Sequence, residues 1–374
     1  MPVTFVPVDS FISNLISHFS IEMTQQCNFR CVYCCYSGNY KNYRSHSGKH
    51  ISKGTIDAAI SFINSYSHKT DLINVSFFGG EALLQLDDIE YIVSRLSSQY
   101  DNRISFDIST NGYLLSDSVV KRICKIKNLN ISVSIDGCRE IHDKYRITRQ
   151  GKPTYNTIYS NLLNFKRNNI EEYNKRIRLL ITLGSLKDAI IINKEYDQFK
   201  EILSDKPLFI SHIIPNFNSQ DLYRDSIEEK RAFYETALEH KKNNISDIST
   251  LLLDELLKKT KKRFLVSSSG KVNVQTCLNM MNCIHIDCDG NLFPCEKFST
   301  NLSIGDVWNG FDRNAIQKIS HKYALRKTLL CSDCKLVEYC NRCLTDLKLS
   351  FSESKIMCQD YIENINLAFT IQNM

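Results

Sequence analysis

Six apolar runs rich in β-branched residues recur between residues 19 and 214, and an amphipathic segment follows each run. Helical periodicity is clear in these segments, for example over 55–66 and 89–96. Strands that alternate with helices predict a parallel sheet with crossover helices. We therefore expect an α/β fold, a partial (β/α)6 barrel of the TIM type, with its chemistry at the C-terminal strand ends. The predicted strands are 19–24, 72–78, 103–109, 129–135, 176–183 and 208–214.

The pattern changes after residue 214. Residues 215–265 are first loop-like and then helical, and a Ser-Ser-Ser-Gly stretch at 267–270 breaks the pattern. Residues 284–293 then alternate around an Asp-Gly pair, which predicts a hairpin that returns Cys295 beside Cys283. We expect three parts: a barrel over 1–214, a helical bridge over 215–265 and a cysteine-rich α+β domain over 266–374.

Composition indicates a large globular protein. Charged residues make up 24% and hydrophobic residues 43% of the 374 residues, and no apolar run approaches the length that spans a bilayer. The N-terminus lacks the pattern of a secretion signal, so we expect a cytoplasmic protein without membrane contact. The net charge of +6 is modest, and the densest basic run, 258–263, is typical of a solvated helix end. We therefore expect no nucleic-acid partner.

Fifteen cysteines in such a chain indicate metal binding or catalysis rather than disulfides. Cys27, Cys31 and Cys34 lie on one short loop directly after the first strand. Three thiolates leave one position open, and a [4Fe–4S] cluster held in this way keeps one iron free for a ligand. A structural zinc knuckle is the alternative for this loop.

The C-x3-C-x2-C spacing, with Tyr33 before the last cysteine, resembles the radical S-adenosylmethionine (radical SAM) family. The resemblance implies that the open iron binds S-adenosylmethionine. It also implies that one electron splits this cofactor to a 5′-deoxyadenosyl radical, which abstracts hydrogen from unactivated carbon. A flavodoxin- or ferredoxin-type protein would donate the electron.

Three further strand ends resemble cofactor-binding motifs of the same family. The second strand ends in Gly-Gly-Glu, the third in Ser-Thr-Asn-Gly, and the fourth in Ser-Ile-Asp-Gly with an arginine downstream. Cys138 stands where the family has proline, and a plain turn at the glycines or a surface salt bridge at the arginine are the alternatives. The resemblance assigns cofactor binding to Tyr33, Gly79, Gly80, Glu81, Ser109, Asn111, Ser134, Asp136 and Arg146.

A second group of cysteines, between residues 277 and 358, resembles the SPASM extension of radical SAM peptide and protein maturases. It provides ligands for two more [4Fe–4S] clusters, three in all, although its final C-x2-C spacing is one residue shorter than in the family. Two zinc ribbons are the alternative, and we assign no role to Cys35 or Cys288. The resemblance places Cys277, Cys283, Cys295 and Cys343 on an inner auxiliary cluster and Cys331, Cys334, Cys340 and Cys358 on an outer one.

The whole array resembles two groups of enzymes that act on peptides or proteins. Ribosomal-peptide maturases form thioether or carbon–carbon crosslinks, and anaerobic sulfatase-maturing enzymes oxidise cysteine or serine to formylglycine. In the sulfatase branch a tyrosine follows the triplet and an acidic residue follows the hairpin cysteine, and here these are Tyr36 and Glu296. We take both as candidate catalytic residues, with Glu296 as a general base. A solvated carboxylate is the alternative for Glu296.

The second strand end lacks the Gln-Gly-Gly-Glu-Pro of the sulfatase branch, which favours a ribosomal-peptide maturase. Formylglycine formation is the second expectation, and an RNA-modifying radical SAM enzyme or an iron–sulfur electron carrier are alternatives from other classes. Only 18 residues precede the first predicted strand. We therefore expect a leader peptide to be recognised by the barrel, by the bridge or by a separate protein.

Overall fold

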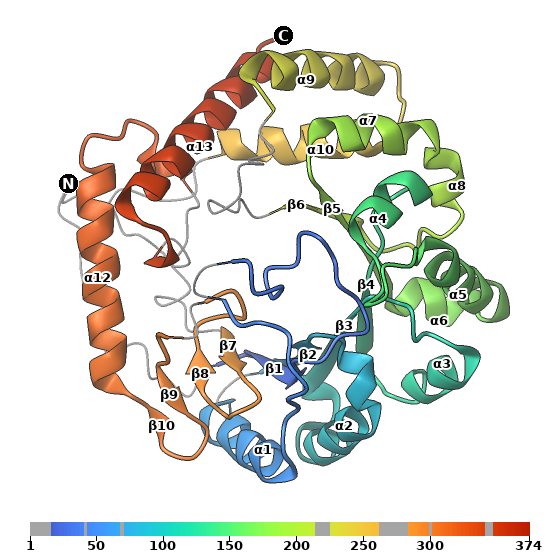
Figure 1. Cartoon of the computed structure of the whole chain (residues 1–374), viewed down its shortest axis with the longest axis vertical. Coiled ribbons are helices and arrows are strands. Elements are labelled where there is room, and N and C mark those ends of the chain that lie inside the picture. Colours follow the sequence, from blue (N-terminus) through green and yellow to red (C-terminus); the bar gives the residue numbers. More distant parts are fainter. Residues whose placement is uncertain are drawn as a thin grey trace.

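The centre of the molecule is a curved sheet of eight strands in the order β6-β5-β4-β3-β2-β1-β7-β8. Strands β1 to β6 are parallel and follow chain order, and helices cover their outer face (Figure 1). This is the open barrel that the alternating pattern predicts. The computed structural model describes residues 16–40, 43–67, 71–213, 225–261, 283–298, 301–340 and 347–374.

The parallel strands confirm the prediction to within one or two residues at each described end. The last predicted run, 208–214, extends past the described residues. The strands are β1 (His18–Thr24), β2 (Ile73–Gly79), β3 (Ile104–Thr110), β4 (Leu129–Ser134), β5 (Ile177–Leu183) and β6 (Phe209–His212).

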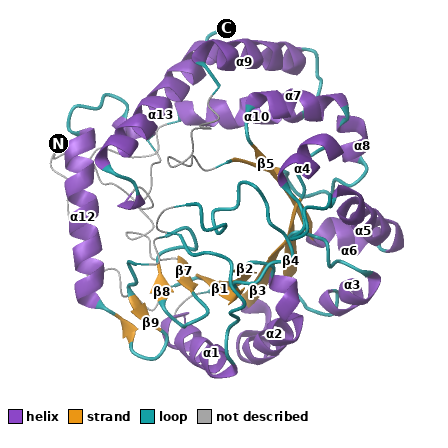
Figure 2. Cartoon of the chain, in the orientation of Figure 1, coloured by secondary structure: helices purple, strands orange, loops and turns teal. Residues whose placement is uncertain are grey.

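Helices form the outside of the ring, and the long loop that follows β1 lies on its inside (Figure 2). The helical periodicity over 55–66 and 89–96 correctly predicts α1 and α2. The barrel helices are α1 (Lys53–Ser67), α2 (Leu86–Tyr100), α3 (Asp117–Ile123), α4 (Arg139–Tyr145), α5 (Tyr155–Asn168), α6 (Ile170–Arg176), α7 (Leu186–Lys194) and α8 (Tyr196–Lys200), with short 3-10 turns η2 (Ala82–Gln85) and η3 (Asp101–Arg103).

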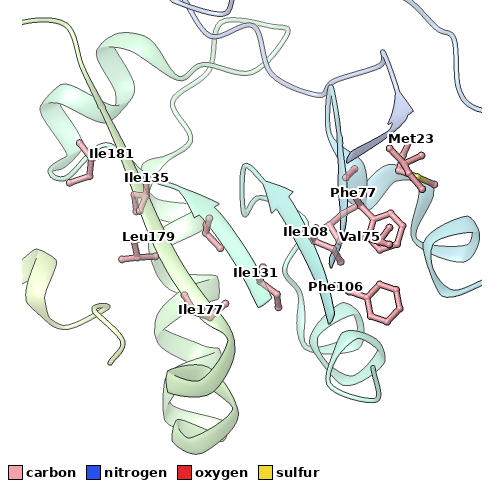
Figure 3. Close-up of a cluster of buried hydrophobic side chains, with 14 of the residues drawn as sticks. Met23, Val75, Phe77, Phe106, Ile108, Ile131, Ile135, Ile177, Leu179 and Ile181 are labelled. Atoms are coloured by element: carbon pink, nitrogen blue, oxygen red, sulfur yellow. The ribbon is translucent and has the colours of Figure 1, made fainter. Parts of the chain in front are cut away.

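Alternate residues of the central strands form the hydrophobic core. In β3 the buried residues alternate with Ser105, Asp107 and Ser109, and the same alternation runs through β4 and β5. Figure 3 shows Phe106, Ile131 and neighbouring apolar side chains of this core. Each such side chain contributes about 1.5–3 kcal/mol through burial. One face of the sheet is thus apolar and the other carries polar groups.

A C-terminal hairpin extends the barrel's own sheet. β7 (Cys283–Ile286) pairs in parallel with β1, and β8 (Leu292–Phe293) pairs antiparallel with β7. In their register His285 stands opposite Phe293 and Ile286 stands opposite Leu292. The hairpin prediction is therefore confirmed. Unexpectedly, this sheet joins the barrel to a segment that the sequence assigns to a separate domain.

The remaining elements close the ring. α9 and α10 fall in the predicted bridge and pack with α13, where Lys230 forms an ion pair with Asp360 at 2.8 Å. α12 lies along the outer edge of the ring (Figure 1). Among the described helices, none is both long enough and apolar enough to cross a bilayer. These elements are α9 (Ile227–Lys242), α10 (Ile248–Leu257), η4 (Lys258–Thr260), β9 (Gly305–Asp306), β10 (Gly310–Phe311), α12 (Arg313–Cys331), η5 (Val337–Tyr339) and α13 (Phe351–Gln372).

Candidate active site

The C-terminal ends of the barrel strands meet around one cavity of about 270 Å³. Cys27, Cys31 and Cys34 face it from the loop after β1. Barrels of parallel strands carry their active sites at the C-terminal strand ends. This cavity is therefore the candidate active site. The strand residues that line it are Phe78, Gly79, Gly80, Ser109, Thr110, Asn111, Ser134, Thr182, Ser211, His212 and, just after β6, Ile213.

Two glycines at the end of β2 let the cysteine loop pass directly over the strand. Gly79 has a φ of +144°, and a Cβ there would lie 2.3 Å from the Thr24 carbonyl oxygen. A Cβ on Gly80 would lie 2.1 Å from the Gln26 carbonyl oxygen and 3.1 Å from the Cβ of Cys27. The Gly80 amide donates to the Thr24 carbonyl oxygen at 2.7 Å. The glycine pair therefore fixes where the cysteine loop begins.

Glu81 lies behind the cavity wall. Its side chain accepts hydrogen bonds from the Thr110 hydroxyl at 2.7 Å, the Asn111 amide at 2.8 Å and the Leu83 amide at 3.1 Å. Burial raises the pKa of Glu81, and these donors oppose the shift. Asn111 in turn donates through its side chain to Asn28 of the cysteine loop, at 2.7 Å. Glu81 thus holds β3 against the cysteine loop, and its direct contact with a cofactor stays a prediction.

Asp136 is a buried acceptor that organises the end of β4. It accepts hydrogen bonds from Arg146 Nε at 2.8 Å, the Tyr33 hydroxyl at 2.5 Å and the Thr182 amide at 2.8 Å. Arg146 and Tyr33 line the cavity, whereas Asp136 stands behind them. Arg146 is only 7% exposed, so the surface salt bridge that the sequence left open is wrong. Burial alone would lower the pKa of Arg146, but the charge of Asp136 raises it above its ordinary value.

His142 supports the same arrangement from behind. The Asp136 amide donates to its Nδ1 at 3.1 Å, so the ring hydrogen is on Nε2, which donates to the Thr154 hydroxyl at 3.0 Å. The Thr154 hydroxyl donates to the Arg146 carbonyl oxygen at 2.7 Å. Burial and the nearby Arg146 charge lower the pKa of His142 to about 3. A neutral histidine therefore fixes the backbone at both ends of the Asp136–Arg146 pair.

The three cysteines fit a cluster that keeps one position open. Burial raises the pKa of Cys27 to about 11 and that of Cys31 to about 12, and the three thiols repel one another's charge. Iron binds thiolates, so cluster assembly here would release protons. Burial also raises the pKa of Cys34, and the nearby Arg146 charge opposes the rise for both Cys31 and Cys34. Three sulfur donors on one side of the cavity, with backbone and polar groups on the other, leave room for a ligand on the cluster.

Tyr36 and Glu296 are neighbours and share a small cavity. The Tyr36 hydroxyl donates to the Glu296 carbonyl oxygen at 3.0 Å. Tyr36 lines both the main cavity and a small cavity of about 40 Å³, whereas Glu296 lines only the small one. Lys297, the next residue, lines the main cavity instead. The general-base role of Glu296 therefore stays a prediction.

Arg44 is a part of the site that the sequence analysis missed. Its guanidinium lies 3.9 Å from the centre of the Tyr36 ring, and its Nε pairs with the buried Glu22. Both terminal nitrogens are buried without a hydrogen-bond partner among the described residues. Arg44 lines the small cavity together with Glu296. A buried positive charge therefore faces the same space as the Glu296 carboxylate.

Other wall residues carry no recognisable motif. Thr182 and Ser211 come from β5 and β6, and Cys35 and His46 come from the loop after β1. His46 Nε2 lies 3.6 Å from the Cys34 sulfur. Single polar residues at strand ends are common, so only the predicted barrel topology could have drawn attention to Thr182 and Ser211.

A second cavity, of about 600 Å³, lies between α12 and α13. All four cysteines that the sequence assigns to the outer cluster line it: Cys331, Cys334, Cys340 and Cys358. Burial raises the pKa of Cys331 to about 11, and the charge of the buried Lys327 opposes this shift. Of the predicted inner set, Cys283 begins β7 and Cys295 follows β8 of the same hairpin, and Cys277 and Cys343 lie outside the described residues.

Within the described ranges, no three histidine, cysteine or carboxylate side chains are close enough to share a single metal ion. A [4Fe–4S] cluster is several atoms wide, so its cysteine ligands stand further apart than those of one zinc ion. The number and type of the metal centres stay predictions.

Residues 21–186, which run from within β1 to just after β5 and include the cysteine loop, match the radical SAM superfamily. The fold and the main cavity agree with this match. Proteins of this superfamily bind S-adenosylmethionine and a [4Fe–4S] cluster, so the match indicates an enzyme.

The chain is similar to the cysteine-type anaerobic sulfatase-maturating enzyme of Clostridium novyi, with 25% identity over 291 residues, 74% of this chain and 72% of that enzyme. It is 30% identical over 149 residues to the serine-type enzyme of Bacteroides thetaiotaomicron, a match that covers 39% of this chain and 35% of that one. A third relative, an uncharacterised protein of Methanocaldococcus jannaschii, is 33% identical over 140 residues, 37% of this chain and 45% of the relative. The chain thus matches less than half the length of two of these relatives.

Solved structures share the fold over nearly the whole chain. Native anSMEcpe with bound AdoMet and Cp18Cys peptide aligns with a TM-score of 0.63 and 18% identity, over 95% of this chain and 98% of that one. Streptococcus suis SuiB bound to precursor peptide SuiA aligns with a TM-score of 0.53 and 12% identity, over 82% of this chain and 66% of that one. The first likeness extends beyond the barrel, which agrees with the expected C-terminal cysteine-rich part.

Proposed function

We propose that this protein is a peptide maturase that cleaves S-adenosylmethionine and oxidatively modifies a ribosomally made peptide. The change would be a thioether or carbon–carbon crosslink or a related oxidation. The observation that carries the proposal is the single cavity where Cys27, Cys31 and Cys34 face Asn111, Ser134 and Arg146. The peptides bound in two of the similar structures support a peptide as substrate.

Cys27, Cys31 and Cys34 would hold the cluster, which supplies the electron for cofactor cleavage. Arg146, kept charged by Asp136, presents a positive group to an anionic part of the cofactor. With the cofactor bound, the chemistry would remove one hydrogen atom and then one electron and one proton from the peptide. Glu296 would take the proton.

The electron from the second step needs an acceptor, and the C-terminal cysteines are suited to hold it. We assign the outer set to one auxiliary [4Fe–4S] cluster because all four line the same cavity. The inner set, with the hairpin pair Cys283 and Cys295, would hold another. Together with the first cluster this makes three. A flavodoxin- or ferredoxin-type protein would exchange electrons with the enzyme, and a separate protein would present a leader peptide.

Formylglycine formation is the second candidate. The match to the Clostridium novyi enzyme covers most of both chains, and the contact between Tyr36 and the Glu296 backbone joins the two residues taken from that branch. Both candidates need the same cavity and the same electron acceptor, so they differ only in the peptide.

Mass spectrometry of two peptides separates the candidates. The anaerobically reconstituted enzyme is given S-adenosylmethionine, a reductant and either a cysteine-containing sulfatase peptide or a precursor peptide encoded beside its gene. We expect the precursor peptide to lose two hydrogens. Loss of two hydrogens together with replacement of sulfur by oxygen in the sulfatase peptide would favour formylglycine, and no change in either peptide would contradict the proposal. Cys31→Ala is the matched inactive control.

A further inference from the structure

The outward face of α12 carries a stripe of four exposed residues that serves neither the core nor the cavities at the strand ends. Lys318, Lys322, Leu325 and Leu329 follow one another at intervals of four, three and four residues, so they share one face of the helix. Leu325 is 63% and Leu329 is 60% exposed. We call these four residues the α12 stripe.

The other face of α12 explains why the stripe points outward. Ile316, Ile319 and Tyr323 are buried against the rest of the protein. Arg326 donates to the Leu349 carbonyl oxygen at 2.6 Å and to the Ser354 hydroxyl at 2.9 Å, which fixes α12 against the start of α13. The stripe is therefore held in place by a firmly anchored helix.

The stripe is basic at one end and apolar at the other. The sequence of α12 contains no aspartate or glutamate, so acidic groups of its own helix do not neutralise Lys318 and Lys322. The apolar end leads to the second cavity, because Leu329 lies on the wall that Cys331 also lines. At the rim, Lys335 and Asp333 carry opposite charges. The stripe extends over about 16 Å of helix.

We propose that the α12 stripe is the docking surface for an acidic one-electron carrier of the flavodoxin class. This inference rests on the proposed function, in which the outer cysteines hold a cluster that exchanges electrons. Two lysines would attract the acidic rim of the carrier, and two leucines would contact the apolar surface around its flavin. The carrier takes up the one electron that leaves the substrate radical, and no atom is transferred. Electron-transfer complexes are small and transient, so a patch of this size suffices.

The test measures binding of an FMN-loaded bacterial flavodoxin to the holoenzyme under anaerobic conditions. The variant K318E/K322E reverses both charges of the stripe. We expect its affinity at low ionic strength to fall about tenfold or more, because like charges then face each other. Added salt should weaken the wild-type complex in the same way, since exposed charges are screened over about 10 Å at 0.1 M. Leu325→Ser should weaken binding without changing the salt dependence.

The matched control is K125E/K127E, which makes the same charge change at two exposed lysines after α3, on the opposite side of the ring (Figure 1). It should bind like wild type. Dithionite-driven cleavage of S-adenosylmethionine should be unchanged in both double variants. Equal binding by K318E/K322E and wild type, or equal loss in the control, would overturn the proposal. So would conversion of a dimer to a monomer by K318E/K322E, because a second copy would then occupy the stripe.

The outcome is separable from that of the proposed function. If no peptide is modified but flavodoxin binding still depends on Lys318 and Lys322, the docking surface stands and the maturase proposal fails. If peptide is modified and flavodoxin binding does not depend on Lys318 or Lys322, the docking proposal is wrong and the maturase proposal stands.

Discussion

At the scale of single residues, Gly80 decides whether the cysteine loop can form. A Cβ at this position would lie 2.1 Å from a backbone oxygen of the loop, so Gly80→Ala must displace the loop. We expect bound iron to fall by about four atoms, the content of one cluster, and cleavage of S-adenosylmethionine to be lost. Iron analysis after anaerobic reconstitution measures the first, and 5′-deoxyadenosine formation the second.

Gly48→Ala is the control, because a Cβ at Gly48 would have no neighbour within 4 Å. Full iron content and normal cleavage in Gly80→Ala would show that the loop tolerates the displacement.

Glu296 is the residue whose predicted role most needs a direct test. Glu296→Gln removes basicity and keeps shape, and the Tyr36 contact survives because it uses the Glu296 backbone. We expect full iron content and normal deuterium transfer from substrate to 5′-deoxyadenosine, while product formation slows about a hundredfold or more. Rates of both steps come from one mass-spectrometric time course.

Glu228→Gln, an exposed carboxylate in the first turn of α9, is the control. Product formation by Glu296→Gln within about a factor of two of wild type would make Glu296 an ordinary solvated carboxylate.

At the scale of elements, the cavity between α12 and α13 predicts two separable activities. Cys334→Ala should remove the outer cluster, which holds about four irons, and leave the cysteine loop after β1 unchanged. We expect 5′-deoxyadenosine still to form and modified peptide to disappear, because the second oxidation step loses its electron acceptor. Cys124→Ala, at the end of α3, is the control and should change neither 5′-deoxyadenosine formation nor peptide modification. If Cys334→Ala modifies peptide at the normal rate, the outer cysteines have a structural role.

The elements also show what sequence can and cannot predict. The apolar, β-branched runs located β1 to β6, because each strand carries its own run in the local sequence. The pairing of β7 with β1 was not predicted, because a strand does not encode which distant edge it will join. Sequence motifs predicted the residues that β2, β3 and β4 contribute to the main cavity, whereas Thr182 and Ser211 belong to no local motif. Glu296 lines the small cavity and Lys297 lines the main one, a difference that only the structure reveals.

At the scale of the whole molecule, buried neutral histidines predict sensitivity to acid. The pKa of His142 is lowered to about 3 by burial and by Arg146. Below pH 6.5 the unfolded chain binds a proton at His142, whereas the folded protein does not until about pH 3. Between these two values the free energy of unfolding therefore rises with pH and falls as the medium is acidified. For one histidine the slope is about 1.4 kcal/mol per pH unit. Burial also lowers the pKa of three further histidines, His18, His46 and His285.

Anaerobic urea unfolding at several values between pH 4.5 and 7.5 measures this slope. His142→Gln should reduce the slope by about one proton, because glutamine can still accept from the Asp136 amide but does not titrate. The exposed His50→Gln is the control. An unchanged slope in His142→Gln would mean that His142 also becomes protonated in the folded state.

The join between β1 and β7 has a consequence for synthesis on the ribosome. Ser20 of β1 and His285 of β7, which form a hydrogen bond, stand 265 positions apart in the chain. At ordinary translation rates roughly 10–50 s separate their emergence. During that interval one edge of β1 has no partner, and exposed strand edges recruit other chains. A strand that is translated late therefore protects the first one, and a nascent chain truncated before residue 283 would keep an unpaired strand edge beside its cysteine loop.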